Sequence, residues 1–368
     1  MRTTLVVVIV NQHPADALGG SEIQCDIIAR GLEQRGHQVH YLAVAGSTAT
    51  TYDAPYFVHP VARSAAAIAT AIRELAPDVV YWRFNKHCFA TAARAIHQAG
   101  IPIVFSVSHV RDVCRWYLPP DFWPRFSFRT ARRALKDSYR LFVEHAGFAY
   151  VDALVSNNPD YLGRVSVPAQ EYIPNSMATT AEPFEWPRPY CLWVANIKPR
   201  KQPERYIELA RALASSGTDF LMVGKVQSPR YRSLLLPEVT PTNFRYLGEK
   251  RLEEVNGMLA SSLFLVHTCQ PEGFSNNMIQ AWLQGKPVVS LAFDPAGLIV
   301  SRRLGLFAGD DMALFVDQTR RLIADAELRR DIGDRARSFA QENFSSRKNV
   351  DGLADLLVRV ATASPVRS

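Results

Sequence analysis

The sequence predicts an α/β protein with two facing Rossmann-like domains. Short β-branched runs such as Leu5–Val10 alternate with amphipathic helical segments, which is typical of strands buried on both faces of a parallel sheet. The alternation stops at Met177–Pro189, which holds three prolines, and then restarts. The chain has 368 residues, about twice the usual domain length of ~100–200. We therefore expect an N-terminal domain at 1–176, a linker at 177–189 and a second domain at 190–345.

The N-terminal half begins with the strand Leu5–Val10 and a glycine-bearing loop, Asn11–Gly20. A helix follows, and Ser21 with Gln24 three residues later predicts a capping box at its start. Gly36 is expected to end this helix. Further strands are expected at 39–44, 78–82, 101–107, 153–156 and 171–173, with helices at 68–75 and 89–98.

The second half repeats the pattern after the proline-rich segment. Strands are expected at 190–195, 220–223, 244–247, 263–267 and 287–291, and helices at 203–215, 252–260 and 276–284. Helices fill most of 312–360, and we expect residues 346–368 to form a helical tail that packs back on the N-terminal domain. Two such domains place a ligand cleft between the carboxyl ends of their sheets.

Composition excludes several protein classes. Hydrophobic residues make up 48% and charged residues 21%, so the chain is not disordered, collagen-like or a coiled coil. The five scattered cysteines form no CxxC motif and indicate reduced thiols of a cytosolic protein. No apolar run approaches the ~18–20 residues of a membrane span, and Leu5–Val10 is shorter than the ~7–15 residues of a signal-peptide core. We expect a cytoplasmic protein, at most peripheral on the inner face of the cell membrane.

The common nucleotide-binding motifs are missing from the sequence. There is no GxGxxG, and Gly224-Lys225 and Gly285-Lys286 lack the other residues of a P-loop. No Asp-x-Asp offers a carboxylate pair for a metal–diphosphate complex. These absences argue against a dehydrogenase, a P-loop NTPase and a metal-dependent nucleotidyl transferase, and we expect no metal site.

The most specific segment is Pro271–Val289. It contains a strand end, the pair Glu272-Gly273, a helix that begins near Ser275, and a turn into a buried strand. Glu272 can accept hydrogen bonds from sugar hydroxyls, while the N–H groups of the first helical turn, Ser275–Asn277, and the helix dipole can hold phosphate. The segment therefore predicts a sugar-diphosphate site. The alternative is a polar turn followed by a serine N-cap.

With its neighbours, this segment resembles the donor-binding motif of GT-B glycosyltransferases, specifically the retaining family 4 (glycosyltransferase group 1). The resemblance covers nearly the whole chain and includes Asn11–Gly20, Tyr172–Asn175, Leu192–Lys201 and Phe244–Gly248. It implies the GT-B fold and a metal-independent hexosyltransferase-type enzyme (EC 2.4). It also implies a UDP- or GDP-sugar donor as co-substrate, with no cofactor. A glycan or lipid-linked acceptor would be expected, in envelope or extracellular polysaccharide or glycoconjugate biosynthesis.

The resemblance also assigns residues. Glu272, Lys201 and His109 take the catalytic positions: Glu272 on the donor sugar, Lys201 on the diphosphate, and His109, after the strand 101–107, near the sugar. The ribose-binding glutamate of the family is Gln280 here and its diphosphate arginine is Asn196, so Arg200 or Lys198 would supply the charge. The full donor-binding set is Gly19, Gly20, Asn196, Arg200, Lys201, Gly248, Gly273, Phe274, Ser275, Asn276, Asn277 and Gln280.

Mechanism follows from the charges that the reaction develops. Cleavage of the anomeric C–O bond leaves negative charge on the diphosphate, which Lys201 and the helix start at Ser275–Asn277 would stabilise. Double displacement needs a carboxylate nucleophile. Because position 280 is a glutamine, the motif contains only one carboxylate. Attack by the acceptor on the face from which the diphosphate departs therefore fits the sequence better than double displacement. Two alternatives stay open: a nucleotide-sugar epimerase, and a non-catalytic sugar-nucleotide binder.

The positive charge of the chain is concentrated in one segment. Residues 111–140 hold eight basic and three acidic side chains, so they account for five of the net seven positive charges. Aromatic residues are interleaved with the arginines of Arg125–Arg140. This pattern indicates an anionic membrane surface or lipid-diphosphate acceptor, with a solvated helix face as the alternative. Nucleic acid is not expected, because no nucleic-acid-binding motif accompanies the patch.

Overall fold

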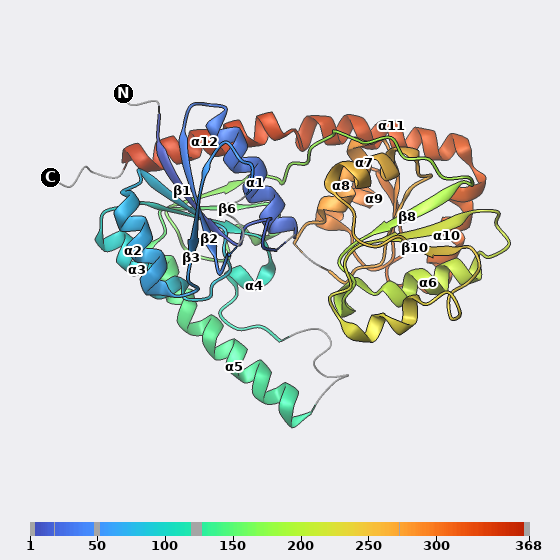
Figure 1. The fold of residues 1–368 in the computed structure, drawn as a ribbon, viewed down its shortest axis with the longest axis horizontal. Helices are drawn as coiled ribbons and strands as arrows, with labels where there is room; N and C mark the ends of the chain where they lie inside the picture. The colour runs from blue at the N-terminus through green and yellow to red at the C-terminus, as the bar shows by residue number, and fades with distance from the viewer. Residues whose placement is uncertain (1–3, 18, 48–51, 119–126, 272, 364–368) are drawn as a thin grey trace. The chain divides into compact units, whose positions relative to one another are not determined.

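The computed structural model describes residues 4–17, 19–47, 52–118, 127–271 and 273–363. The chain divides into two compact units, one formed by residues 1–176 with 346–368 and the other by residues 177–345. Each unit is built on its own parallel sheet with helices on both faces (Figure 1). The predicted class of two Rossmann-like domains is confirmed.

The sheet of the first unit has seven parallel strands in the order β3-β2-β1-β4-β5-β6-β7. The strands are β1 Val6–Asn11, β2 Gln38–Val44, β3 Phe57–Val61, β4 Val79–Trp82, β5 Ile103–Val107, β6 Ala153–Ser156 and β7 Ala169–Tyr172. The helices are α1 Gly20–Glu33, α2 Ala65–Leu75, α3 Phe89–Gln98, α4 Val110–Val113, α5 Phe128–His145 and α12 Ser346–Ala363.

Alternate side chains of β1 supply two separate cores. Val8 and Val10 belong to the core that includes α2 and α3, whereas Val7 and Ile9 belong to the core that includes α1 and α12. All four side chains are fully buried. A strand covered on both faces has little room for polar side chains, so the β-branched run of the sequence follows from its position.

The C-terminal helix α12 completes the first unit by packing on α1. Val350 and Leu353 of α12 are buried in the same core as Leu32 of α1. The close approach requires a small residue on α1, because a Cβ added to Gly31 would lie 2.9 Å from Cγ1 of Val350. The first unit therefore includes a segment that follows the whole second unit in the sequence.

The predicted capping box at the start of α1 is wrong. The helix begins at Gly20 with Gly19 as its N-cap, and no side chain caps it. The Ser21 hydroxyl instead accepts a hydrogen bond from Nδ2 of Asn11 at 3.1 Å. Gln24 bonds to both backbone groups of Ser176, accepting from its N–H at 2.9 Å and donating to its carbonyl at 2.5 Å. Both polar side chains are used for tertiary contacts rather than for local capping.

The sheet of the second unit has six parallel strands in the order β10-β9-β8-β11-β12-β13. The strands are β8 Tyr190–Val194, β9 Asp219–Val223, β10 Phe244–Tyr246, β11 Leu265–His267, β12 Val288–Ser290 and β13 Gly305–Phe307. The helices are α6 Pro203–Ala212, α7 Leu252–Ser261, α8 Asn276–Leu283, α9 Leu298–Ser301, α10 Met312–Ala324 and α11 Ala326–Asn343.

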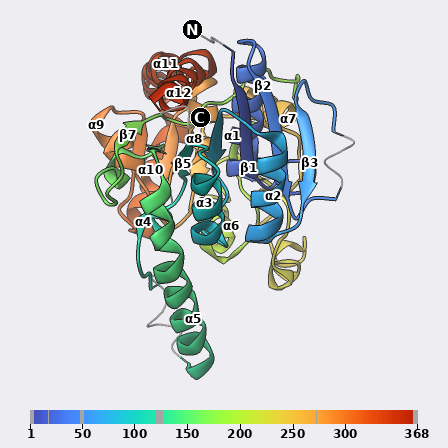
Figure 2. The same cartoon turned by 90° about the vertical axis from the view of Figure 1, so that its left-hand side faces the viewer.

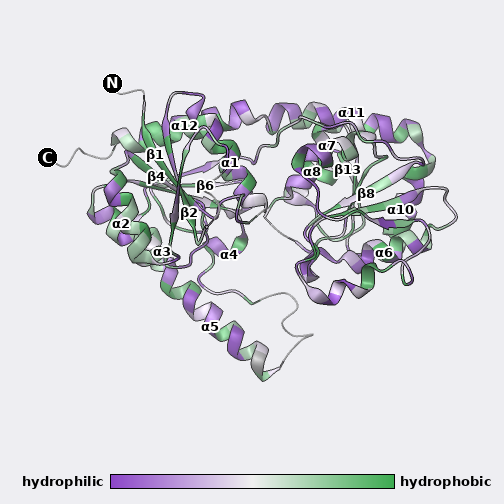
Figure 3. Ribbon diagram, viewed as in Figure 1, coloured by the Kyte–Doolittle hydropathy of each residue, from purple (hydrophilic) through white to green (hydrophobic). Residues whose placement is uncertain are grey.

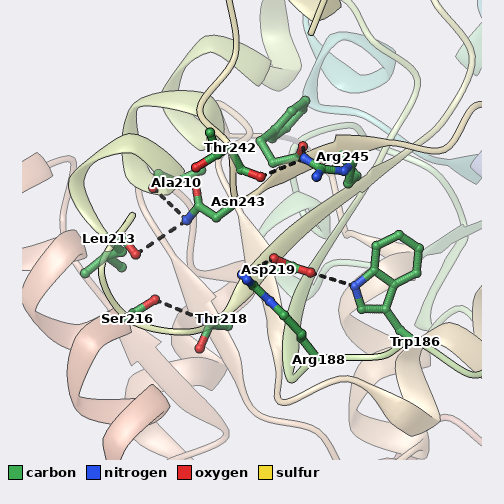
Figure 4. A network of polar contacts seen from close by, with 11 residues as sticks. Trp186, Arg188, Ala210, Leu213, Ser216, Thr218, Asp219, Thr242, Asn243 and Arg245 are labelled. Atoms are coloured by element: carbon green, nitrogen blue, oxygen red, sulfur yellow. Dashed lines mark hydrogen bonds and ion pairs between the residues drawn. The ribbon is translucent and has the colours of Figure 1, made fainter.

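The proline-rich segment 177–189 is hydrogen-bonded to the second unit along its length. Nδ2 of Asn256 donates to the carbonyls of Ala178 and Thr180 at 3.0 and 2.8 Å. Asp219 of β9 accepts from Nε1 of Trp186 at 2.8 Å and pairs with Arg188 at 2.5 Å (Figure 4). Without an apolar period of its own, the segment is fixed in an extended path by these polar contacts.

The amphipathic helix α5 extends away from the sheet of the first unit (Figure 2). Ala134 and Leu141 are buried, whereas Phe128, Leu135, Tyr139 and Phe142 are exposed. Apolar and polar residues alternate along this helix (Figure 3). No helix within the described ranges is long and apolar enough to cross a membrane.

Two glycines in helices give a test of this packing. A Cβ on Gly257 of α7 would lie 1.7 Å from the carbonyl oxygen of Glu182, so we expect Gly257→Ala to lower the free energy of unfolding by about 1–3 kcal/mol or more. Gly352 of α12 has no atom within 4 Å of that position, so Gly352→Ala should raise stability by up to about 1 kcal/mol. Urea unfolding followed by circular dichroism measures both, and equal stability of the two variants would contradict the packing of 177–189 on α7.

Candidate functional site

Polar and basic residues collect at the carboxyl edge of each sheet. In a parallel sheet all strands end at the same edge, so the loops that follow them are neighbours. In the second unit these loops follow β8, β9, β10 and β11, and α8 begins there. The sequence-predicted donor residues within 196–280 lie on these loops or on α8.

The loop after β8 carries Lys198, Arg200 and Lys201 and is called the basic loop. It is hydrogen-bonded to the loop after β11. The Thr268 hydroxyl donates to the carbonyls of Lys201 and Gln202 at 2.8 and 3.0 Å and accepts from Nε1 of Trp193 at 2.9 Å. The Gln270 N–H donates to the carbonyl of Arg200 at 2.9 Å. These bonds hold the short helical turn 199–201, and Arg200 and Lys201 on it and Lys198 just before it are half-exposed.

Arg200 reaches the residue that precedes Glu272, which the sequence predicts to bind the donor sugar. Its Nη2 donates to the carbonyl of Pro271 at 2.8 Å, one residue before Glu272. Glu272 itself lies outside the described residues. Arg200 therefore attaches its own loop to the segment that follows β11. Asn196 is half-exposed at the start of the same basic loop.

Two glycines allow the loops after β8, β9 and β10 to approach one another. A Cβ on Gly224 would lie 1.8 Å from the carbonyl oxygen of Ala195. The Gly224 N–H donates to the carbonyl of Gly248 at 2.8 Å, and Gly248 has a φ of 77°, in the left-handed region that favours glycine. Gly248 thus lies next to the loop that follows β9, at the same edge as the basic loop.

Helix α8 begins at this edge with Ser275 as its N-cap. Ser275 is buried and its side chain makes no capping hydrogen bond. Asn276 and Asn277 are half-exposed in the first turn, and Nδ2 of Asn277 donates to the carbonyl of Val194 at the end of β8. The start of α8 is thereby attached to the strand that leads into the basic loop.

Two other predicted donor residues are buried beside this helix. Phe274 packs against Trp282 and Phe344 with ring centroids 6.5 and 5.4 Å away. Gly273, beside it, is also buried. The aromatic cluster fixes how the segment 273–275 enters the helix, so the contribution of Phe274 at this edge is to hold the turn.

Gln280 is buried in the structure, with 3% of its surface exposed. Its Nε2 donates to Oδ1 of Asn256 at 2.9 Å, and Asn256 in turn bonds to the carbonyls of Ala178 and Thr180. The side-chain amide thus connects α8 to α7 and to the segment 177–189. No sequence pattern pointed to this contact.

In the first unit, His109 follows β5 as predicted and is the N-cap of α4. Its Nδ1 accepts from the Arg111 N–H at 3.1 Å. A ring nitrogen that accepts carries no proton, so the neutral ring has its proton on Nε2. The N–H groups of Ser108 and His109 both donate to Asp112 at 2.9 Å. Burial raises the pKa of Asp112, and these two backbone hydrogen bonds oppose the rise.

Lys86 is a buried basic residue that the sequence analysis missed. Its Nζ donates to the carbonyl of Cys114 at 2.7 Å and lies 5.7 Å from the ring centroid of Phe148. Burial lowers the pKa of Lys86 to about 8, although Asp112 favours its charged form. A single lysine after a strand has no local signature, so no sequence pattern could have singled it out.

Buried aromatic side chains hold the start of the loop that follows β1. His13 is fully buried, its Nδ1 accepts from the Ala15 N–H at 3.2 Å and its Nε2 lies 3.1 Å from the Tyr56 hydroxyl. Tyr56 donates to Asp26 at 2.5 Å, so it accepts from His13. Burial lowers the pKa of His13, which favours this neutral form. The network fixes the backbone around His13 and Ala15.

The predicted site residues therefore fall into two groups. Lys201, Arg200, Asn196, Gly248 and the start of α8 lie at one edge of the second unit, and Gln280 is buried behind it. His109, Gly19 and Gly20 belong to the first unit. Among the described residues, no group of three or more His, Cys, Asp or Glu side chains is placed to hold a metal ion.

The lowered pKa of Lys86 predicts a pH dependence of stability. Between about pH 8 and 10.5 the unfolded chain still binds the proton and the folded chain does not, so the free energy of unfolding of the wild type should rise with pH. Lys86→Met removes this rise. Melting temperatures of both proteins across this pH range measure the difference, with Lys136→Met, at an exposed position of α5, as the control. Parallel curves for wild type and Lys86→Met would contradict the prediction.

Comparison with solved structures shows the fold. Sucrose-phosphate synthase from Thermosynechococcus elongatus matches with a TM-score of 0.79 at 16% identity, covering 98% of this chain and 100% of the other. HepE from Anabaena, in complex with UDP-glucose, matches with 0.71 at 16% identity, covering 96% and 100%. WaaG, a glycosyltransferase involved in lipopolysaccharide biosynthesis, matches with 0.72 at 17% identity, covering 96% and 99%. A search of curated proteins finds no match.

Two family profiles match the chain, one in each unit. Residues 18–146 match Glycosyltransferase Family 4 and residues 188–325 match Glycosyl transferases group 1. The second match spans the basic loop, Gly248 and α8, and the first spans α1, β5 and His109. The chain belongs to glycosyltransferase family 4, the group 1 glycosyltransferases, and has the two Rossmann-like domains of the GT-B fold.

Proposed function

We propose that the protein is a retaining hexosyltransferase that moves a sugar from a UDP-sugar to a hydroxyl acceptor. The observation that carries the proposal is the attachment of the basic loop after β8 to the segment that follows β11 and precedes α8. The structure of HepE with UDP-glucose supports a uridine nucleotide as the donor class. An acceptor in envelope or extracellular polysaccharide or glycoconjugate synthesis fits the family, and WaaG is one such enzyme by its description.

The reaction requires that this edge of the second unit binds the departing diphosphate. The ammonium group of Lys201 and the helix start at Asn276–Asn277 supply positive charge and N–H donors to the oxygens that become negative in the transition state. Because Thr268 binds the carbonyl of Lys201, the backbone that carries this ammonium group is held in place before the donor binds. Fixed donors of this kind need no reorganisation during the reaction, and they make a metal ion unnecessary.

Glu272 would bind hydroxyls of the donor sugar. Attack by the acceptor on the side from which the diphosphate leaves needs no second carboxylate, and the buried amide of Gln280 fits this route. The departing diphosphate then accepts the proton of the acceptor hydroxyl. His109, with its proton on Nε2 when neutral, can donate a hydrogen bond to a sugar hydroxyl.

Asn196 and Gln280 differ from the family pattern, and we propose that other groups of the second unit take over the two functions. Asn196 replaces a diphosphate-binding arginine, and Arg200 and Lys198 lie on the same fastened loop. Gln280 replaces a ribose-binding glutamate, and its amide is bonded to Asn256. We propose that the backbone around Gly248 binds the ribose. Gly248 has a left-handed conformation, which presents peptide groups at this edge.

Donor binding tests the proposal first. Among UDP-glucose, UDP-galactose, UDP-N-acetylglucosamine and GDP-mannose, one UDP-sugar should raise the melting temperature most, with the same shift in EDTA. Lys201→Ala and Glu272→Ala should each lower kcat for transfer by about 10²–10³. Lys201→Ala should also weaken UDP binding in calorimetry, whereas Glu272→Ala should not. Arg330→Ala, at an exposed position of α11, is the matched control.

The outcomes separate the alternatives. Near-normal transfer by both variants overturns the site. An epimerised sugar nucleotide formed from donor alone, without acceptor, indicates an epimerase. UDP-sugar binding without turnover on any acceptor indicates a non-catalytic binder.

We also propose that α5 docks on an anionic membrane surface. Phe128, Leu135, Tyr139 and Phe142 recur at spacings of seven, four and three, which places them on one face of the helix. Arg133, Lys136 and Arg140 recur at three and four on an adjacent face. The buried residues Ala134 and Leu141 lie on the remaining face, toward the first unit. Arg125 lies outside the described residues, as does the rest of 119–126.

This arrangement suits the interface of a bilayer. Exposed aromatic and leucine side chains can enter the headgroup region while the basic face meets anionic lipid. Each basic residue near such a surface contributes about 1 kcal/mol. A lipid-linked acceptor would then be met at the membrane where it resides.

Vesicle flotation tests the membrane proposal. The double variant Arg133→Glu with Lys136→Glu should weaken binding to phosphatidylcholine vesicles containing phosphatidylglycerol by about thirtyfold or more, from two lost contributions of ~1 kcal/mol each. Leu135→Ser with Phe142→Ser should weaken it as well. The control is Arg73→Glu with Arg94→Glu, which changes the net charge equally at exposed positions of α2 and α3. Equal losses in test and control variants, or wild-type binding insensitive to salt and to phosphatidylglycerol, would refute docking through α5.

A further inference from the structure

His109 is carried by a helix of a single turn. α4 contains only Val110–Val113, with His109 as its N-cap and Cys114 as its C-cap. A helix this short is not stable by itself, since helices below ~12–15 residues are marginal in water. Val113 anchors α4 in the core, but the two polar ends of the helix need partners of their own. The groups that bind these ends therefore set the backbone that carries His109.

The amino end of α4 is closed by a reciprocal pair of side chains. Asp112 accepts the N–H groups of Ser108 and His109, both at 2.9 Å. Nδ1 of His109 in turn accepts the Arg111 N–H at 3.1 Å. This is a capping box, with histidine in the place of the usual serine or threonine. While the box is closed, Nδ1 is an acceptor and the neutral ring carries its proton on Nε2.

The carboxyl end of α4 is held by Lys86, from the loop after β4. Its side chain is 4% exposed, and its Nζ donates to the carbonyl of Cys114 at 2.7 Å. The last carbonyls of a helix have no partner within the helix, and here an ammonium group supplies the donor. Lys86 and Asp112 thus bind opposite ends of the same turn.

The loop that carries Lys86 is itself fixed on both sides. Before Lys86, the N–H of Phe84 donates to the carbonyl of Val10 in β1 at 2.8 Å. After it, Glu144 of α5 accepts the N–H of Cys88 at 2.9 Å. Lys86 is therefore attached to the sheet on one side and to α5 on the other, so it can hold α4 in one position.

The two side chains that bind the ends of α4 carry opposite charges. Burial lowers the pKa of Lys86 to about 8 and raises the pKa of Asp112, and each charge opposes the effect of burial on the other. Glu144 also favours the ammonium form of Lys86, whereas Arg111 disfavours it. Burial lowers the pKa of the neighbouring His145 to about 4, so that ring adds no charge at neutral pH. An ionised Asp112 accepts its two N–H groups more strongly than a neutral carboxyl would.

We propose that Lys86 is a positioning residue for His109, fixing α4 from its carboxyl end as Asp112 fixes it from its amino end. Without the ammonium group, the Cys114 carbonyl loses its donor, Asp112 loses a favourable charge, and the turn that forms the capping box loosens. The ring of His109 then samples both neutral tautomers, so the hydrogen bond from Nε2 to the sugar hydroxyl is formed only part of the time. The inference rests on the proposed role of His109 in sugar transfer.

The imidazole ring of His109 gives the direct readout, by NMR of protein labelled with ¹⁵N at histidine. The His109 signals are assigned by their loss in His109→Gln, and the wild type should show one neutral tautomer with the proton on Nε2. Lys86→Met should give signals averaged over both tautomers, as should Asp112→Ala. Lys86→Arg keeps the charge and donors, Asp112→Asn keeps an acceptor for both N–H groups, and each should retain the wild-type tautomer. Arg94→Met, at an exposed position of α3, is the control.

Two results of this experiment would overturn the proposal. The first is a wild-type His109 with its proton on Nδ1, or with no fixed tautomer, because the capping box would then not be held. This readout needs no variant, so it decides the matter even if Lys86→Met does not fold. The second is an unchanged set of His109 signals in a folded Lys86→Met protein, because α4 would then keep its conformation without the ammonium group.

Kinetics below the melting temperatures of all variants separate positioning from a general loss of stability. Lys86→Met should lower kcat for transfer by about 10–100-fold, while the Kd for UDP, which lacks the sugar, stays at the wild-type value. The double variant Lys86→Met with His109→Gln should transfer as fast as His109→Gln alone, because the effect of Lys86 passes through His109. A further loss of rate in the double variant would reject the proposal.

These measurements distinguish the failure of this inference from the failure of the function on which it rests. Absence of transfer by the wild type with any acceptor would count against the proposed function, while the tautomer of His109 would still test the positioning. Normal transfer by the wild type, with losses in the Lys86 and His109 variants that simply multiply, would reject the positioning alone.

Discussion

Burial of the parallel sheets on both faces is the constraint on which the rest of the structure depends. In the first unit, Val7 and Ile9 face one core and Val8 and Val10 face the other, so β1 has no position for a polar side chain until Asn11. All five residues of β5 are buried as well, and Ser106 is the one polar side chain among them. Polar side chains that solvent can reach are therefore left mainly to the residues that follow each strand.

Loops in such positions need fixed conformations, and the structure obtains them from hydrogen bonds between neighbouring loops. Thr268 holds the carbonyls of Lys201 and Gln202, and Asp112 holds the N–H groups of Ser108 and His109. In each case one buried or half-buried side chain satisfies two backbone groups of a loop. These residues fix the backbone that presents a basic or imidazole side chain.

Local patterns predicted the elements well and the tertiary contacts poorly. The β-branched runs identified β1 and its partners because their burial leaves a local composition signal. The edge strands β3 and β13 were not predicted, since β3 contains Pro60 and β13 begins at Gly305, both unfavourable in strand interiors. Ser21 and Gln24 matched a local capping box, yet Gln24 bonds to Ser176, 152 residues away. Arg83 and Lys86 belong to no sequence motif. What distinguishes each of them is its burial, which the local sequence does not reveal.

The side chain at position 280 has to match the hydrogen-bonding groups of its buried partner, Asn256. A glutamate there would place a carboxylate against Oδ1 of Asn256, two acceptors facing each other in a buried space, which is unfavourable without a proton between them. Glutamine instead donates to Asn256, and Nδ2 of Asn256 remains available for the carbonyls of Ala178 and Thr180. Glutamine at 280 and asparagine at 256 therefore form a matched pair. Their neutral hydrogen bonds connect the helix at the candidate donor site to the extended segment through which the chain enters the second unit.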